Sequence, residues 1–293
     1  MCGHRGIEFL IRKEPYLVWR CKDCGHGWVD PPPSQEEIGA YYASKISLEE
    51  HHFPEKNTIK HAKRVYRWIG QVLTPPGKLL DIGCGRGIQM KVAKQAGWHP
   101  VGIEWTEALR KGLLSQQWEV FPSCQELPVD YGSSFDVVTA LEVLEHQADP
   151  GSFLEQIRSF MKEKGVLALS TPNFGSIVSR QDPARWHEIV PPSHLHFFTP
   201  ESLRCLMNKK GFYIIDQLTY GVFSPALDRF VESVNRLFNF SPEKLFVLKT
   251  GLYRAAKFYF DRTLQIKKQG LGLLTLAGLF PERTHSNLRK YFC

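Results

Sequence analysis

From residue 78 to residue 219, short apolar runs alternate with longer stretches in which apolar residues recur every three or four positions. The short apolar runs predict buried strands, and the three-to-four spacing predicts amphipathic helices. The expected strands are residues 78–82, 100–104, 119–121, 135–140, 166–171 and 212–219, and the expected helices are residues 88–96, 107–116, 152–161 and 200–210. Strands of this kind separated by helices predict an α/β fold, in which helices cover both faces of a parallel sheet.

The segments on either side of this region have a different character. Residues 34–57 are polar and lead into an amphipathic stretch, so residues 34–76 are expected to be a helical lead-in. Two Ser-Pro pairs, at Ser224 and Ser241, each match a helix N-cap followed by proline at the first helical position. They predict two helices within residues 221–268, and the apolar residues 270–280 predict one more strand.

Most of the net positive charge of the chain lies in residues 221–268, which hold nine Lys and Arg against four Asp and Glu. The formal net charge of the whole chain is +7. Three interpretations are open: a cap packed on the sheet, a dimer face, or a pair of helices in peripheral contact with a membrane surface. The aromatic spacing in this segment is helical and differs from the stacking pattern of a nucleic-acid groove. A nucleic-acid partner is therefore not expected, and the sequence leaves the oligomeric state open.

Composition excludes disorder as the general state, because 43% of the 293 residues are hydrophobic. The chain has seven cysteines, and only Cys21 and Cys24 stand close together, which favours a reducing compartment over a disulfide scaffold. The first residues lack the charged-then-apolar pattern of an export signal. We therefore expect a cytoplasmic protein.

Residues 1–33 contain a tight Cys-x-x-Cys-Gly turn between two strand-like segments, residues 16–20 and 27–29, and end at three prolines. Two thiolates at this spacing can share one tetrahedral zinc ion, which predicts a small Cys-rich knuckle. Cys2, Cys21 and Cys24, with either His4 or His26, would complete such a zinc site. The alternative is a turn that holds no metal.

The sharpest motif is a glycine-rich turn that follows the first expected strand of the alternating region, with Asp81 before it and glycines at Gly83, Gly85 and Gly87. A dinucleotide-binding turn would place its third glycine one position later, and an acidic residue here would repel a pyrophosphate. An acidic residue suits the ammonium of S-adenosylmethionine, and glycines let the backbone approach that ligand. Glu104, at the end of the next strand, can hold both ribose hydroxyls, while Cys124 and Gln125 would lie near the adenine.

In these motifs the chain resembles the class I S-adenosylmethionine-dependent methyltransferases, and in particular the broad subgroup that includes ubiquinone-biosynthesis O-methyltransferases. The resemblance rests on residues 80–87, 102–104, 127–128, 134–138, 141–146, 165–173 and 196–203. It implies a three-layer Rossmann-like sheet of seven strands, the last one antiparallel, in a domain spanning residues 77–293. Residues 270–280 would then be that last strand, residues 221–268 a helical insertion before it, and residues 1–33 the knuckle that many members carry. The expected cofactor-binding residues are Asp81, Gly83, Gly85, Gly87, Glu104, Cys124, Gln125 and Leu141.

Candidate catalytic residues follow the fourth strand, at the carboxyl edge of the sheet where ligands bind in open α/β folds. Glu142, Glu145 and His146 would share one face if the loop turned helically. In the groups that the chain resembles, this pattern binds a divalent metal such as Mg²⁺ with a further histidine, for which His196, or His194, is the match. The alternatives are that His146 acts as a general base without metal, or that Glu145 and His146 only stiffen the loop.

His194 and His196 would face the same way if their segment were extended. Trp186 and His187 would wall the acceptor pocket or lie in a surface loop. The resulting expectation is methyl transfer from S-adenosylmethionine to a small-molecule acceptor, most readily at oxygen. The alternatives are methylation of an RNA end, and a catalytically inactive module that binds the cofactor and serves assembly.

Overall fold

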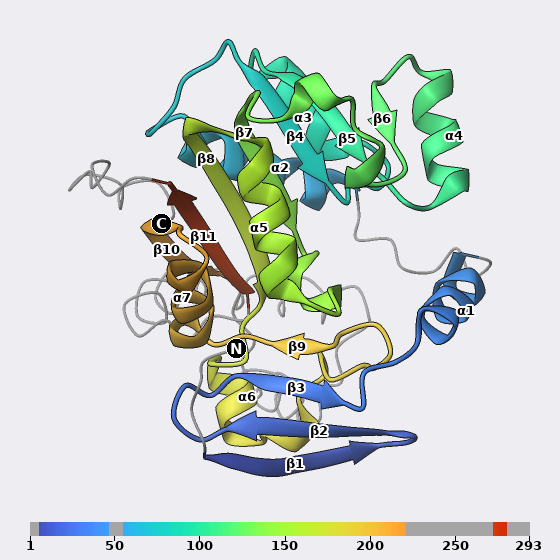
Figure 1. Cartoon of the computed structure of the whole chain (residues 1–293), viewed down its shortest axis with the longest axis vertical. Helices are drawn as coiled ribbons and strands as arrows, with labels where there is room; N and C mark the ends of the chain where they lie inside the picture. Colours follow the sequence, from blue (N-terminus) through green and yellow to red (C-terminus); the bar gives the residue numbers. More distant parts are fainter. Residues whose placement is uncertain (1–5, 47–54, 221–271, 280–293) are drawn as a thin grey trace, which may run out of the picture.

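The computed structural model describes residues 6–46, 55–220 and 272–279, which form two β-sheets and their helices (Figure 1). The larger sheet has seven strands in the order β10-β11-β8-β7-β4-β5-β6. Its strands are β4 (Lys78–Ile82), β5 (His99–Ile103), β6 (Val120–Phe121), β7 (Phe135–Leu141), β8 (Met161–Pro172), β10 (Tyr213–Tyr220) and β11 (Gly272–Gly278). β4 to β8 pair in parallel, and β11 is antiparallel to both β8 and β10. The expected seven-stranded sheet with an antiparallel last strand is confirmed.

Successive residues of a strand point to opposite faces of the sheet. Because these strands carry apolar residues on both faces, both faces of the sheet have to be covered, and helices cover them. One core joins Leu80 and Val138 to α5 (Pro150–Phe160) and α7 (Pro200–Lys209). The other core joins Leu79 and Val137 to α2 (Glu55–Ile69) and α3 (Ile88–Gln95). α4 (Glu107–Ser115) packs beside β6 through Leu113. The three-layer arrangement follows from strands that are apolar on both faces.

The smaller sheet combines the N-terminal segment with a strand from much later in the chain. Its antiparallel order is β1 (Ile7–Lys13), β2 (Tyr16–Cys21), β3 (Gly27–Asp30) and β9 (His196–Phe197). β2 and β3 confirm the two strands expected around the Cys-x-x-Cys turn, whereas β1 and β9 were not expected. Val18 and Val29 share a buried cluster with Phe174, Trp186 and Phe197, so the N-terminal segment packs directly against residues 174–198.

The first helix of the segment that was expected to be a helical lead-in, α1 (Gln35–Ile46), lies beside the two sheets (Figure 1). The Oγ of Ser34 accepts from the N–H of Glu37 at 3.1 Å, and the carboxylate of Glu37 accepts from the N–H of Ser34 at 2.7 Å. This reciprocal capping box explains where α1 begins.

The connections contain short helical segments that place loop residues. They are η1 (Cys124–Glu126), η2 (Val129–Tyr131), η3 (Leu144–His146), α6 (Ile177–Gln181) and η4 (Pro183–Arg185). The predicted insertion, residues 221–268, lies outside the described residues, so its three interpretations as a cap, a dimer face or a membrane-surface helix pair stay open. Within residues 6–46, 55–220 and 272–279, no helix is both long and apolar enough to cross a membrane.

Candidate active site

The glycine turn after β4 is built from three residues with left-handed backbone conformations, since φ is 73° at Gly83, 54° at Gly85 and 73° at Gly87. A Cβ at Gly83 would lie 2.7 Å from a methyl group of Val143, and one at Gly87 would lie 2.6 Å from a methyl group of Leu113. Around Gly85, no described atom lies within 4 Å of such a Cβ. The turn is therefore packed at its two ends and open in the middle, where a ligand can approach the backbone.

Glu104 holds this turn from the end of β5. One carboxylate oxygen accepts from the N–H of Gly85 at 2.9 Å, and the other accepts from the N–H of Thr106 at 2.7 Å. Each carboxylate oxygen can accept a further hydrogen bond. Glu104 thus lies next to the open part of the glycine turn with acceptor capacity left for two hydroxyls.

Asp81 is a buried residue of β4, two positions before the first glycine of the turn. Its Oδ1 accepts from the hydroxyl of Thr139 at 2.6 Å, whereas its Oδ2 has no hydrogen-bond partner among the described residues. Burial raises the pKa of Asp81 to about 7, and the nearby charge of Glu104 acts in the same direction. A buried carboxylate oxygen without a donor is costly, and a bound ammonium would satisfy it.

The other expected cofactor-binding residues lie around the same edge of the sheet. Cys124 is half-buried in η1, and burial raises the pKa of its thiol to about 11, so that the thiol is neutral at physiological pH. Gln125 is exposed beside it. Leu141, the last residue of β7, is half-buried and packs against the core on the α2 and α3 side.

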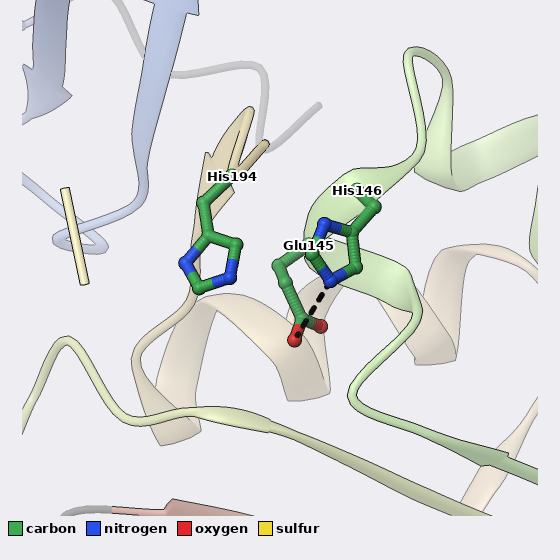
Figure 2. A group of neighbouring side chains, drawn as sticks. All are labelled: Glu145, His146 and His194. Carbon is green, nitrogen blue, oxygen red and sulfur yellow. Dashed lines mark ion pairs between the residues drawn. The ribbon is translucent and has the colours of Figure 1, made fainter. Parts of the chain in front are cut away.

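Glu145, His146 and His194 form a group in which one ligand atom from each residue lies within 4.8 Å of the others (Figure 2). Glu145 and His146 come from η3, and His194 comes from the short segment between the turn at residues 191–193 and β9. The Nε2 of His146 lies 3.8 Å from a carboxylate oxygen of Glu145, and the two imidazole centroids are 4.8 Å apart. Val143, just before η3, packs on Gly83, so this group lies next to the glycine turn.

Hydrogen bonds fix which nitrogen of each imidazole is basic. The Nδ1 of His146 lies 2.8 Å from the carbonyl of Ser193, and the Nδ1 of His194 lies 2.9 Å from the carbonyl of Glu188. Because a carbonyl oxygen only accepts, we assign the proton of each imidazole to Nδ1, which leaves the lone pair on Nε2. Burial lowers the pKa of both imidazoles, that of His194 to about 4, so both are neutral at neutral pH.

Glu145 is the least solvated member of the group, with 1% of its side chain exposed. Burial raises its pKa well above the ordinary value for a glutamate, and the nearby carboxylate of Glu142 adds to that shift. Its two carboxylate oxygens are buried and have no geometrically well-formed hydrogen bond among the described residues. The group therefore offers two basic nitrogens and one carboxyl with vacant acceptor sites.

The expectation that His196 joins this group is wrong. The Nδ1 of His196 lies 3.3 Å from the Nε2 of His26, and its Nε2 lies 3.4 Å from the carbonyl of Ala148. An extended segment was expected, but residues 194 and 195 belong to no strand and β9 begins only at residue 196. The two histidines have different partners, and His194 takes the place that was expected for His196.

Glu142 also stands apart from the two histidines. Its φ is 58°, and η3 begins only at Leu144, so the helical face expected for Glu142, Glu145 and His146 does not form. Its carboxylate accepts from the hydroxyls of Ser170 at 2.6 Å and of Tyr220 at 3.1 Å. The four-residue metal site of Glu142, Glu145, His146 and His196 is therefore not present in the predicted form.

The Cys-x-x-Cys turn is folded, but its ligand set is not decided by the described residues. The N–H of Gly25 donates to the carbonyl of Cys21 at 2.9 Å, and φ is 72° at Gly25. The Cys2 and His4 positions lie outside the described residues. The ring of His26 is buried against His196, and within the described ranges the cysteine pair belongs to no group of three metal-ligating side chains. Zinc binding stays a prediction.

Two further contacts of the site had no signal in the local sequence. The hydroxyl of Tyr42 in α1 lies 3.0 Å from the Nδ1 of His146, and its ring packs edge-on against Trp105. The Ser34-x-x-Glu37 pattern identifies the start of α1, but no local pattern reveals a contact between residues 104 positions apart. Trp186, which was expected either to wall the acceptor pocket or to lie in a surface loop, is instead buried in the core of the smaller sheet.

Known proteins match this chain over the region that contains the glycine turn and the Glu145 group. The profile of a family described as "Methyltransferase domain" matches residues 55–217. The ubiquinone biosynthesis O-methyltransferase of Bartonella quintana (strain Toulouse) is 27% identical over 166 residues, which cover 52% of this chain and 67% of that protein. The enzyme of the same name from Histophilus somni (strain 2336) is 36% identical over 107 residues, covering 33% of this chain and 45% of that protein. The alignments therefore span between about half and two thirds of these relatives.

Among solved structures, a similar fold is that of the Burkholderia thailandensis 1,6-didemethyltoxoflavin-N1-methyltransferase, which was crystallised with 1,6-didemethyltoxoflavin and S-adenosylhomocysteine. The TM-score is 0.51 at 16% sequence identity, and the alignment covers 92% of this chain and 98% of the other. At this identity the likeness concerns the fold alone.

Proposed function

The chain belongs to the methyltransferase domain family and is an S-adenosylmethionine-dependent methyltransferase, and on that premise we propose that it transfers the methyl group to an oxygen atom of a small molecule. The observation that carries the choice of oxygen is the pair of neutral imidazoles, His146 and His194, whose basic Nε2 atoms meet beside Glu145. A hydroxyl is a weak nucleophile until a base takes its proton, and this group supplies such a base.

Cofactor binding is assigned to the glycine turn and its two carboxyls. Asp81, whose buried Oδ2 has no partner among the described residues, is proposed to accept from the ammonium of S-adenosylmethionine. Glu104 is proposed to accept from the ribose hydroxyls with the lone pairs that Gly85 and Thr106 leave free. The open backbone at Gly85 admits the ligand between them. When bound, S-adenosylmethionine supplies the electrophilic methyl group.

Methyl transfer is a displacement in line at the methyl carbon, and the protein has to orient the acceptor and exclude water. We assign the acceptor proton to the Nε2 of His146: the O–H bond breaks toward this nitrogen, the oxygen forms a bond to the methyl carbon, and the carbon–sulfur bond pair stays on sulfur. The products are the methyl ether and S-adenosylhomocysteine, and the proton leaves His146 to solvent. Glu145 lies 3.8 Å away and, in its ionised form, would stabilise the charged imidazole.

The same group also fits a divalent ion. One carboxylate and two Nε2 lone pairs are a donor set that Zn²⁺ or Mn²⁺ accepts, and carbonyl partners at the two Nδ1 atoms are the usual support of metal-bound histidines. Glu145, His146 and His194 would hold the ion, which would lower the pKa of a bound hydroxyl. In that case His146 and His194 would serve as ligands, and the methyl acceptor would stay the same.

The test is a label-transfer assay with methyl-tritiated S-adenosylmethionine, given separately to a small-molecule extract and to size-selected RNA. We expect label in the small-molecule fraction, as an alkali-stable ether, and its loss by a factor of about 100 or more in His146→Ala. Label in RNA would favour the alternative acceptor, and no turnover with cofactor binding intact would favour an assembly module. Exhaustive chelation separates the two versions of the site, because only the metal-assisted version loses activity.

A further inference from the structure

Tyr42 connects the two halves of the candidate site. Its hydroxyl lies 3.0 Å from the Nδ1 of His146 and 3.3 Å from the Oγ of Ser193. Its ring packs edge-on against Trp105, with centroids 5.1 Å apart, and Trp105 directly follows Glu104. One side chain of α1 therefore contacts both the histidine assigned to the acceptor and the residue beside the carboxylate assigned to the ribose.

The direction of each hydrogen bond around His146 follows from its partners. The carbonyl of Ser193 only accepts, so the proton on Nδ1 belongs to the histidine. The hydroxyl oxygen of Tyr42 then accepts from the same N–H, and the hydroxyl proton is available to the Oγ of Ser193. Two acceptors thus surround one proton and leave the lone pair on Nε2.

We propose that Tyr42 is a positioning residue of this site: its hydroxyl holds the Nδ1 proton and the ring orientation of His146, so that Nε2 faces Glu145 and His194. This role rests on the proposed function only where Nε2 of His146 acts in methyl transfer. The hydrogen bond itself can be measured without a methyl acceptor. It applies whether Nε2 takes a proton or a metal ion, since both require the proton to stay on Nδ1.

Two features favour a specific role over simple packing. The contact is made by the hydroxyl, which a merely structural aromatic residue would not need, and it joins elements from distant parts of the chain, α1 and η3. Tyr41, the neighbouring residue in α1, packs edge-on against Tyr42 with centroids 5.5 Å apart. It provides a matched control, because Tyr41→Phe removes the same atom from the same helix.

The experiment is ¹⁵N–¹H NMR of the histidine side chains in the full-length protein, its Tyr42→Phe variant and its Tyr41→Phe variant, at neutral pH. We expect the Nδ1 proton of His146 to exchange with water at least about tenfold faster in Tyr42→Phe, as the loss of one hydrogen bond implies. Tyr41→Phe should leave that exchange unchanged, and the exposed His99 should be unaffected in both.

Unchanged exchange in Tyr42→Phe, or equal acceleration in both variants, would overturn the assignment. Calorimetry with S-adenosylhomocysteine checks that the fold is intact, because we expect both variants to bind it as the wild type does. A loss of that affinity confined to Tyr42→Phe would mean that the substitution acts through the fold, and would also overturn the assignment. If the protein transferred methyl groups to no acceptor, the proposed function would be contradicted. The NMR result for Tyr42 would still hold.

Discussion

The backbone N–H of Leu195 donates to the carbonyl of Glu145 at 2.8 Å, which ties the segment carrying His194 to the turn carrying the other two members of the group. The carbonyl of Leu195 accepts in turn from the N–H of Val29 in β3 at 2.9 Å. The N-terminal sheet therefore reaches the candidate active site through one residue. Its β3–β9 pairing holds the position of His194, although the N-terminal strands contribute no member of the group.

Gly27→Ala is predicted to disturb this connection. A Cβ at Gly27 would lie 3.1 Å from Phe197 and 3.2 Å from Phe174, and both aromatic side chains are buried. Overpacking of this kind costs about 1–3 kcal/mol of the free energy of unfolding. We expect a lower melting temperature and, because β9 shifts, reduced methyl transfer.

The matched control is Gly39→Ala in α1. Around Gly39 no described atom lies within 4 Å of an added Cβ, and alanine favours the helix by up to about 1 kcal/mol. Thermal unfolding should therefore show an unchanged or slightly raised melting temperature. Equal destabilisation by the two substitutions would contradict the packing argument.

Removal of either cofactor carboxylate is predicted to weaken binding with the fold retained. A hydrogen bond to a charged group contributes about 1.5–3 kcal/mol, so Asp81→Ala and Glu104→Ala should each lower the affinity for S-adenosylmethionine about tenfold or more. Calorimetry measures this directly. Unchanged affinity in both variants would refute the assignment of the site.

Cofactor affinity should also depend on pH through Asp81. Burial raises the pKa of Asp81 to about 7 in the protein without ligand, so the carboxyl is increasingly neutral below that pH and loses its attraction for the ammonium. Affinity should rise as the pH increases toward 7, by up to about tenfold per pH unit, and level off above it. In Asp81→Asn, which carries no titratable group, binding should be weaker and this dependence should disappear.

Glu145→Gln is predicted to stabilise the protein and abolish its activity. The pKa of Glu145 is raised in the folded state, so the folded protein binds the proton more tightly than the unfolded chain does. Stability contributed by Glu145 is therefore lost as the pH rises above the unfolded pKa of about 4.3. At neutral pH, Gln should raise the free energy of unfolding by about 0.5–2 kcal/mol, as replacements at strained functional positions do. Denaturant unfolding at two pH values tests this, since the gain should shrink at low pH.

If the Cys-x-x-Cys turn binds zinc, elemental analysis should find about one zinc per chain, and Cys21→Ser should release it and lower the melting temperature. Cys205→Ser, in α7, is the matched control and should retain the metal. Protein without zinc and with an unchanged melting temperature would identify the turn as a metal-free hairpin.

The larger sheet and its glycine turn can be predicted from the amino-acid pattern. Apolar runs such as Leu79–Leu80 reveal buried strands because both strand faces are covered, and the Asp81 to Gly87 spacing is local chemistry that one strand–turn–helix unit displays in full. The residue types after β7 likewise identified Glu145 and His146 as candidates, because the carboxyl edge of a parallel sheet is where such residues gather.

Which side chains meet in the site depends on how distant segments pack together. The choice of His194 over His196 depended on the hydrogen bond of Leu195 to Glu145 and on the pairing of β9 with β3, neither of which has a local period. Tyr42 reaches His146 across 104 positions, and its place is set by the packing of α1. Hydrophobic periodicity shows which face of a helix or strand is buried. Contacts between distant loops depend on how whole elements pack, and no periodic pattern in the sequence encodes such contacts.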